Sequence, residues 1–540
     1  MSLSVTPFEK SPGKEPAPAF QQRLGLFDAT MLVAGSMIGS GIFIVSADIV
    51  RDVGSAGWLL LVWALTGLMT VIGALSYAEL AAMMPHAGGQ YVYLREAYGP
   101  LWGFLYGWTS FLVIQTGTIA AVGVAFAKFL GVLVPALGTD PKAGAAVLLE
   151  VGRFTVTAGQ VVAVAMIALL TAVNWLGVQE GKWVQNVFTV AKTGALALLI
   201  VLGLTLAANR EAVAANTADW WGGITQTAGF EKLHGWLPSA ALVAVMLVGG
   251  AMVGSLFSAD AWNNVTFTAG EVRNPRRNLP LSLALGTGLV IVLYFLANVV
   301  YVVSLPTLGD PRLHPRMQLL GKAAEELERS GQKEEAERIR KEMQNTLQEC
   351  TTYQRGIAYA ADDRVGTAVM ELVAPGAGVG IMAVAIMAST FGCANGLILA
   401  GARLTYAMSR DGLFFRAVGR LNRHGVPAVG LLLQGVWACL LVFSGTYGQL
   451  LDYIIFAALL FYALTVGGLF VLRYRRPGAE RPYRAVGYPL LPGLYVLLCA
   501  AVALDLLFVK PLYTWPGLII VLTGIPVYFF WRRGTWLTLR

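Results

Sequence analysis

Long hydrophobic segments separated by short polar connections make up most of this 540-residue chain. About twelve of them are long enough to cross a hydrocarbon core of roughly 30 Å as helices. We expect these spans at residues 26–50, 57–82, 101–133, 157–177, 184–207, 238–267, 281–305, 378–408, 427–446, 450–472, 488–509 and 513–531. The flank before the first span is polar and contains proline, so we expect that span to stay as a membrane helix and not to be cleaved as a signal peptide. The pattern predicts an all-α, multi-pass membrane protein.

Small and polar residues interrupt two of these spans. The first contains Gly35-Ser36-Met37-Ile38-Gly39-Ser40-Gly41-Ile42-Phe43, and the sixth contains Gly254-Ser255-Leu256-Phe257-Ser258-Ala259-Asp260-Ala261. Unwound backbone inside a bilayer is tolerated only where protein buries it or where it lines a water-filled cavity. Gly35 and Gly39 in the first run form a GxxxG spacing, as do Gly250 and Gly254 at the start of the second, and this spacing taken alone more often indicates close packing of helices. Because the two runs lie roughly 210 residues apart, the length of one five-helix repeat, we interpret them as equivalent breaks in two inverted halves.

Broken helices of this kind expose unpaired backbone groups. The free N–H groups at a helix N-terminus attract a carboxylate, and free carbonyls at a C-terminus attract an ammonium group. An α-amino acid carries both charges on one carbon. The chain has no phosphate-binding loop, dinucleotide-binding glycine pattern, HExxH motif or nucleophile elbow, and its cysteines stand singly at 350, 393, 439 and 499. We therefore expect a transporter without cofactor or metal, and not an enzyme.

Composition and charge agree with a membrane protein and indicate its orientation. Hydrophobic residues make up 56% of the chain, charged residues 13%, and the mean hydropathy is +0.64. The net charge of +8 comes from arginines and lysines in alternate connections, which the positive-inside rule places on the cytoplasmic side. Both termini are then cytoplasmic. This charge indicates topology and contact with anionic lipids, and not nucleic-acid binding.

The predicted spans divide the chain into three regions. Residues 1–25 form a cytoplasmic tail, 26–472 a ten-helix core, and 473–540 a linker, two further helices and a short cytoplasmic C-terminus. A charged insertion on the outer side, residues 307–376, interrupts the core, and its densest part predicts two helices around Ser330 and Gly331. An exposed surface decoration is the simpler interpretation of this hairpin. Docking of a partner and a lid over the outer mouth are the alternatives.

Several motifs in this chain resemble the amino acid-polyamine-organocation superfamily, and within it the L-type amino acid transporters and their bacterial relatives. The motifs are the first break, Ser76 to Leu80 at the end of the second span, Val184 to Lys192, Phe257 to Asn263 with Gly270 to Pro280, and Asn395-Gly396 with Ser409 to Gly412. The resemblance covers nearly all of residues 24–485. It implies a LeuT-type fold, with five plus five inverted helices and two appended ones, and transport of amino acids by alternating access.

The resemblance also assigns a substrate site to the two breaks. The backbone N–H groups of Ser40, Gly41 and Ile42, with the Ser40 hydroxyl, would hold the carboxylate. Carbonyls of Met37 and Phe257 would receive the ammonium group, with those of Ser258 and Asp260 as further candidates. Phe257 would stack over the substrate as a gate, although an ordinary core aromatic is the alternative. The full predicted set is Ser36, Met37, Gly39, Ser40, Gly41, Ile42, Phe257, Ser258, Ala259, Asp260, Cys393 and Asn395.

Lys192 is the most informative single residue. If its helix begins near Trp183, a rise of about 1.5 Å per residue places Lys192 roughly 12 Å into the membrane. An unpaired lysine there would cost about 2.5 to 3.5 kcal/mol, unless the side chain reaches back to the inner surface. The resemblance implies a third interpretation, in which the ammonium group occupies the position of a sodium ion and links the fifth helix to the unwound part of the first. Transport would then not need sodium.

Asp260 is the second charged residue placed within the membrane. Its carboxylate could face the pocket, and the resemblance implies a wider substrate list without choosing from it, because an acidic residue here occurs both in carriers of cationic amino acids and in carriers of small neutral ones. Alternatively it binds the free N–H groups of its own broken helix and is structural. Among the other charges, Glu79 is expected to make structural contacts on the cytoplasmic side. Those near segment ends are expected at the membrane interface, namely Lys128, Arg403, Asp452 and Lys510.

These observations predict a sodium-independent transporter in the cytoplasmic membrane that exchanges neutral L-amino acids, with cationic ones left open. A polyamine or cationic amino acid antiporter is one alternative. A transporter-like sensor is another, which the short segment after residue 531 disfavours. Animal L-type members bond to a single-span glycoprotein through a cysteine between their third and fourth helices. Residues 134–159 contain no cysteine, so we expect amino acids and lipids as partners and no covalent heavy chain.

Overall fold

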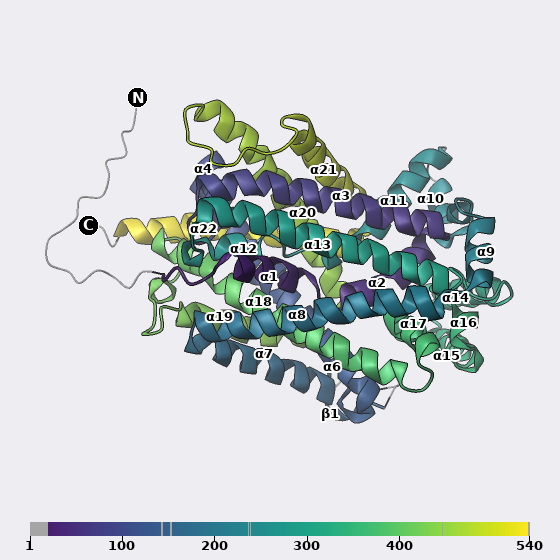
Figure 1. Ribbon diagram of the computed structural model, residues 1–540. Coiled ribbons are helices and arrows are strands. Elements are labelled where there is room, and N and C mark those ends of the chain that lie inside the picture. The colour runs from purple at the N-terminus through teal and green to yellow at the C-terminus, as the bar shows by residue number, and fades with distance from the viewer. Residues whose placement is uncertain are drawn as a thin grey trace, which may run out of the picture.

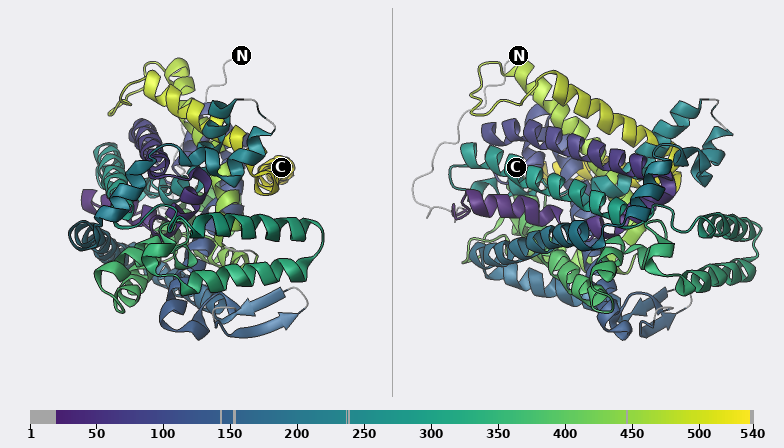
Figure 2. Two further views of the ribbon diagram at one scale, coloured as in Figure 1. Left: turned by 90° about the vertical axis from the view of Figure 1, so that its right-hand side faces the viewer. Right: turned by 45° about the vertical axis from the view of Figure 1, so that its right-hand side comes forward.

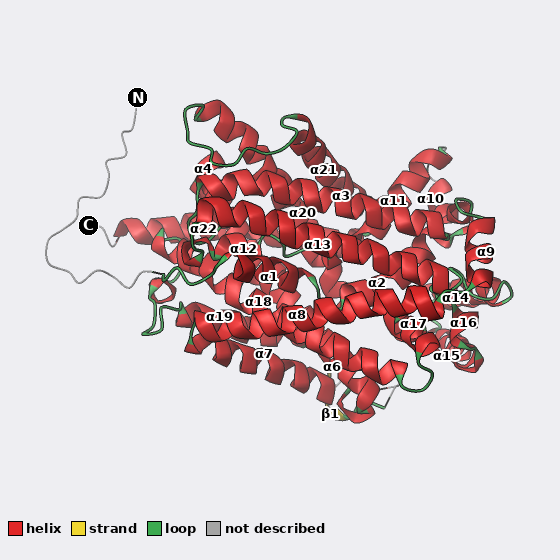
Figure 3. Ribbon diagram, in the orientation of Figure 1, coloured by secondary structure: helices red, strands yellow, loops and turns green. Residues whose placement is uncertain are grey.

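Helices dominate the computed structural model, as Figure 3 shows. The structure describes residues 20–141, 144–151, 154–235, 237, 239–444 and 447–537, so most of the predicted cytoplasmic tail, residues 1–19, lies outside the described residues. The long helices lie side by side in one bundle, and the start of α1 and the end of α22, near the two ends of the described chain, lie at the same end of it (Figure 1). A chain this apolar folds into helices because a helix satisfies its own backbone hydrogen bonds in lipid.

Among the described residues, eleven helical segments are long and apolar enough to cross a membrane. The first is α1 (Leu26–Met37) with α2 (Gly41–Val53), and the third is α5 (Pro100–Thr109), η1 (Ser110–Ile114) and α6 (Gln115–Leu133). The others are α3 (Ala56–Met83), α7 (Ala158–Leu176), α8 (Val178–Leu202) continued by η4 (Gly203–Ala207), α11 (Ala240–Ser258), α13 (Pro275–Ser304), α18 (Gly378–Arg410), α20 (Tyr447–Arg475), α21 (Leu490–Val509) and α22 (Pro511–Leu537). The ninth predicted span, 427–446, is a shorter apolar helix, α19 (Ala428–Val442).

Short elements connect the long helices. On the side of the chain termini they are α4 (Gln90–Tyr98), α12 (Asn264–Phe267), η6 (Ala269–Glu271) and η8 (Arg416–Gly419). At the opposite end they are η2 (Pro135–Leu137), β1 (Val147–Val151), β2 (Phe154–Thr157), α9 (Arg210–Ala218), η5 (Gly223–Gln226), α10 (Ala228–His234), α14 (Leu313–Arg329), α15 (Lys333–Glu349), α16 (Thr352–Arg355), η7 (Ala361–Asp363) and α17 (Val365–Val373). The antiparallel pair of β1 and β2, and the helices α9 and α10, were not predicted from the sequence.

The charged insertion forms the predicted pair of helices. Helices α14 and α15 are joined by a turn at Ser330 and Gly331, and they project from the bundle at the end far from the chain termini (Figure 2). Gly331 has a φ of 83°, a left-handed conformation that glycine adopts without strain. Ion pairs hold the two helices together, with Arg316 3.2 Å from Glu342, and Lys322 ties α14 to Glu231 of α10 at 2.6 Å.

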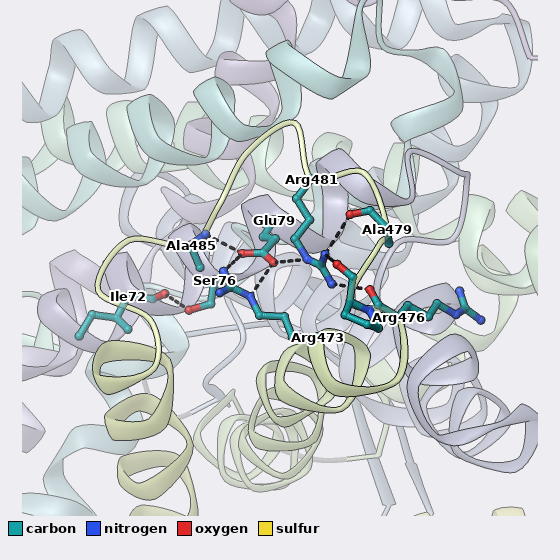
Figure 4. A network of polar contacts seen from close by, with 9 residues as sticks. Ile72, Ser76, Glu79, Arg473, Arg476, Ala479, Arg481 and Ala485 are labelled. Atoms are coloured by element: carbon teal, nitrogen blue, oxygen red, sulfur yellow. Dashed lines mark hydrogen bonds and ion pairs between the residues drawn. The ribbon is translucent and has the colours of Figure 1, made fainter.

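Glu79 makes the structural contacts predicted for it. Its carboxylate accepts two hydrogen bonds from Arg473, at 2.9 and 2.6 Å, and one from the backbone of Ala485 at 2.7 Å (Figure 4). Arg481 lies 3.3 Å away. The end of α3 is therefore tied to the linker between α20 and α21. A fully buried carboxylate is stable here because two cations and a backbone N–H surround it.

Arg403 corrects a prediction, because it is buried and not at the membrane interface. Its guanidinium binds the Glu271 carboxylate with two hydrogen bonds of 3.1 and 3.2 Å, and each side chain is 1% exposed. Burial raises the pKa of Glu271, against the opposing effect of Arg403. Beside this pair the backbone of Leu24 forms a parallel bridge with Val272. The segment before α1, the connection before α13, and α18 are thus joined at one place.

We expect Arg403→Met to lower the free energy of unfolding by about 3 to 5 kcal/mol, because it leaves the Glu271 carboxylate buried without a cation. Thermal unfolding of the purified protein in detergent measures this. Arg276→Met is the matched control, because Arg276 pairs with Glu480 on the surface and such pairs contribute about 0 to 1 kcal/mol. The double variant Arg403→Met with Glu271→Leu should recover most of the loss. Equal melting temperatures for Arg403→Met and the control would show that the buried pair is not stabilising.

Candidate functional site

The first break separates α1 from α2. Helix α1 ends at Met37, Ile38 is extended with a ψ of 98°, and α2 begins at Gly41. Because residues 38–40 leave the helix, carbonyls near the end of α1 lose the backbone N–H donors that lie four residues further along a continuous helix. The N–H groups of Gly41 and Ile42, the first two positions of α2, likewise have no intrahelical acceptor. The break therefore presents acceptors on one side and donors on the other, deep in the bundle.

Lys192 satisfies the free carbonyls at this break. Its ammonium nitrogen donates to the carbonyl of Gly35, to that of Ile38 at 2.6 Å, and to that of Ser389 on α18 at 3.3 Å. The side chain is 1% exposed, so it does not reach back to the membrane surface. The Ser389 hydroxyl hydrogen-bonds at the same place, 3.2 Å from the Ile38 carbonyl and 2.9 Å from that of Gly39. One cation and one hydroxyl thus join α8 and α18 to the break.

The second break follows α11. The helix continues to Ser258, four residues beyond Gly254 where the predicted run begins, and α12 starts at Asn264. Gly254 stays helical and lies against Val45 of α2, since a methyl group on it would sit 3.0 Å from the Val45 Cβ. Ala261 adopts a φ of 65°, a conformation that is costly for alanine. Such strain persists where the surrounding structure imposes it, often at functional sites.

The two breaks lie in direct contact. A methyl group on Gly41 would lie 2.9 Å from the Cβ of Ser258 and 3.2 Å from its Cα, so only glycine fits. Cys393 of α18 packs beside Gly39 and donates from its sulfur to the carbonyl of Ser36 at 3.0 Å. The structure therefore brings Ser36, Met37, Gly39, Ser40, Gly41 and Ile42 together with Ser258 and Cys393.

Asp260 lies in the second break and is bound by an aromatic residue that the sequence did not single out. Its carboxylate accepts a hydrogen bond from the hydroxyl of Tyr462 on α20, whose ring stacks on Trp262 with the ring centres 5.3 Å apart. Two small cavities meet at Asp260 and Tyr462, one lined by polar side chains that include Gln90 and Asn263, the other mainly apolar. Residues 36–42 line neither of them.

Other hydroxyl groups around the breaks were also missed. The Tyr294 hydroxyl donates to the Met37 carbonyl at 3.0 Å, and the Tyr301 hydroxyl donates to that of Ile42 at 3.2 Å. Both come from α13. Phe257 and Ala259 are buried near the end of α11, and the Phe257 carbonyl accepts the N–H of Asp260 at 3.2 Å. No local sequence pattern marks a tyrosine whose partner lies more than 200 residues away.

The structure does not bring the Asn395 side chain to the breaks. Its amide accepts a hydrogen bond from Asn174 at 2.9 Å and donates to the Gly181 carbonyl at 2.9 Å and to Gln185 at 3.0 Å. These partners belong to α7 and α8. Asn395 therefore holds α18 against two neighbouring helices, and of the two predicted residues on α18 only Cys393 contacts the break.

The arrangement suits reversible binding of a small zwitterion. It offers backbone donors, backbone acceptors and one carboxylate within a buried region, in which Gly41 lies in contact with Ser258. Among the described residues, no three histidine, cysteine, aspartate or glutamate side chains gather in a way that would hold a metal ion.

Known proteins resemble this chain over nearly its whole length. A family model described as amino acid permease matches residues 24–323 and 354–530, which leaves most of the α14–α15 hairpin unmatched. The b(0,+)-type amino acid transporter 1 of Homo sapiens is 30% identical over 516 residues, covering 95% of this chain and 88% of that protein. The large neutral amino acids transporter small subunit 2 of Homo sapiens is 29% identical over 521 residues, covering 95% and 82%.

Proposed function

The chain belongs to the amino acid permease family, and on that basis we propose that it exchanges L-amino acids across the cytoplasmic membrane without sodium. Its relatives are named as transporters of b(0,+)-type and of large neutral amino acids. The same activity fits a protein whose described residues include eleven helices long and apolar enough to cross a membrane, with a buried site that offers groups for both charges of a zwitterion. The substrate would cross the membrane without chemical change.

The observation that carries the proposal is the position of Lys192. The carbonyls of Gly35 and Ile38 already accept hydrogen bonds from the amino group of Lys192, which belongs to the protein itself, so they do not need a metal ion as a partner. In the predicted mechanism, the N–H groups of Gly41 and Ile42 bind the substrate carboxylate, and carbonyls at the end of α1 and α11 bind its ammonium group. Substrate entry then requires Gly41 and Ser258 to separate, which couples binding to movement of α2 against α11.

Counterflow in proteoliposomes tests the proposal. Vesicles containing the purified protein are loaded in turn with each amino acid, and a labelled neutral amino acid is added outside in sodium-free buffer. We expect uptake that depends on the internal amino acid, is unchanged by added sodium, and leaves the label chemically intact. Uptake only with sodium would contradict the assignment of Lys192. Binding without any flux would favour a sensor, and a converted label would indicate an enzyme.

A second candidate function, exchange of cationic amino acids or polyamines, rests on Asp260. Its carboxylate borders both small cavities beside the second break, where it would pair with a second positive charge. We expect Asp260→Asn to lower exchange of cationic substrates by about tenfold to 100-fold, as for the loss of one charge-assisted bond, and to change neutral exchange little. Competition of arginine and putrescine against labelled leucine measures the difference. An equal loss for all substrates would mean that the carboxylate is structural and acts through its hydrogen bond with Tyr462.

The orientation and the partners of the chain are part of the same proposal. The arginine-rich linker after α20 lies at the same end of the bundle as the start of α1 and the end of α22, which supports cytoplasmic termini by the positive-inside rule (Figure 1). The name of one relative includes the words small subunit, so that protein assembles with another. Residues 134–159 of this chain contain no cysteine, and we propose that it forms no disulfide to a second subunit through that segment.

A further inference from the structure

Asp505 is a carboxylate inside a membrane helix for which the transport site gives no role. It belongs to α21, which is otherwise apolar and whose Leu504 and Phe508 side chains face outward. Both carboxylate oxygens of Asp505 are buried, and neither has a hydrogen-bond partner among the described residues. An ionisable group in a membrane helix is costly, and it is by default a functional candidate.

The carboxylate faces α11, the helix that ends at the second break. A methyl group on Gly249 of α11 would lie 2.5 Å from an oxygen of Asp505, so the glycine provides the space that the carboxylate fills. The segment Ala240–Ser258 contains no titratable side chain. The described titratable residues on α21 itself, at its end, and on the other helices packed against it are Tyr77, Glu79, Tyr462, Arg473, Tyr474, Arg475, Tyr495, Cys499, Lys510, Tyr528 and Arg532.

None of these residues hydrogen-bonds to Asp505. Glu79 and Tyr462 are engaged elsewhere, with Arg473 and Asp260 respectively. An ionised carboxylate that is buried without a partner costs several kcal/mol, whereas the neutral acid costs much less. The neutral acid is therefore the form that fits the packing of α21 against α11.

We propose that Asp505 is a proton-binding site whose occupancy is linked to the packing of α11 against α21. While α11 lies against α21 the carboxylate holds a proton. When α11 moves away, water reaches the carboxylate, which releases the proton to that water as a hydronium ion. Since α11 carries Phe257 and Ser258 to the substrate site, the same movement accompanies opening of that site. This inference goes beyond the proposed function, and only its second test relies on amino acid exchange.

The sign of the linkage follows from which form holds the proton. Acidification favours the form that binds it, so it shifts the equilibrium toward the packed arrangement of α11 and α21. For one proton this shift approaches tenfold per pH unit at most. Alkaline conditions favour separation of the two helices.

The first test needs no transport. Dicyclohexylcarbodiimide reacts with protonated carboxyl groups in apolar surroundings, and mass spectrometry of peptides locates the adduct. We expect the adduct at Asp505 near neutral pH, with less of it as the pH rises to about 9, a range wide enough to titrate buried carboxyls. No adduct at Asp505 in folded protein over the whole range from about pH 5 to about 9 would overturn the proposal.

The second test compares pH profiles. Asp505→Asn keeps the size and polarity of the side chain but binds no proton. The amino acid exchange of this variant should therefore lose the part of the pH dependence that comes from Asp505. Asp505→Glu, which still binds a proton, should retain the pH dependence of the wild type. Glu326→Gln on the exposed face of α14 is the control, and its profile should match the wild type. An Asp505→Asn profile identical to that of the wild type would overturn the linkage. A lack of exchange in the wild type would refute the proposed function and leave the labelling result standing.

Discussion

We expect exchange to fall by at least about 100-fold when Lys192 is replaced by alanine, because the carbonyls of Gly35 and Ile38 would lose their shared cation. A hydrogen bond to a charged group contributes about 1.5 to 3 kcal/mol, and two such bonds therefore exceed the roughly 2.8 kcal/mol that correspond to 100-fold. The lost bonds join the fifth membrane helix to the unwound part of the first, where the substrate is predicted to bind. Initial counterflow rates in proteoliposomes with equal amounts of protein measure the effect.

Lys182→Ala is the matched control for this prediction. It removes a lysine from the same helix, but Lys182 is 24% exposed and pairs with Asp28 at 3.1 Å near the helix start. Partly exposed pairs of this kind contribute about 0 to 1 kcal/mol, so exchange should fall by less than about fivefold. Wild-type rates for Lys192→Ala would remove the lysine from the mechanism. Recovery of its exchange by sodium, in contrast, would indicate that the vacated carbonyls accept a metal ion.

The sequence predicted the helices and their breaks better than the contacts between them. Hydrophobic length locates a membrane helix to within a few residues, and the runs of small residues marked both interruptions. The start of the second break was less well placed. Gly254 stays helical because it packs on Val45, a residue from the other half of the chain, and no local pattern contains that information.

The composition of the candidate site was predicted in part. The backbone groups of the first break and Lys192 followed from helix geometry and from the cost of a buried charge, together with the resemblance to a known family. We missed three hydroxyl groups because each donates a hydrogen bond to a group that is distant in sequence, namely those of Tyr294, Ser389 and Tyr462. Arg403 was misplaced for a similar reason. Its position near a helix end suggested the interface, and only the fold brings Glu271 to it.

Replacing Gly41 with alanine should abolish most exchange and destabilise the protein, although alanine is the better helix former. In an open position this substitution would stabilise a helix by about 0.5 to 1 kcal/mol. At Gly41 the added methyl group meets both the Cβ and the Cα of Ser258, so the two broken helices are forced apart. Overpacking of this kind costs about 1 to 3 kcal/mol. We expect a lower melting temperature and a fall in counterflow of at least about tenfold, which corresponds to 1.4 kcal/mol.

Gly194→Ala provides the comparison, because a methyl group there meets nothing within 4 Å and the residue lies within a membrane helix. Its stability and exchange should equal or exceed those of the wild type. The double variant Gly41→Ala with Ser258→Gly removes the closest side-chain atoms but leaves the backbone of residue 258 only 3.2 Å from the new methyl group, so it should recover part of the stability. Residues that touch show such coupling, whereas distant ones do not. Recovery would therefore mean that the two breaks contact each other directly through residues 41 and 258, and additive losses would mean that Gly41 acts through another neighbour.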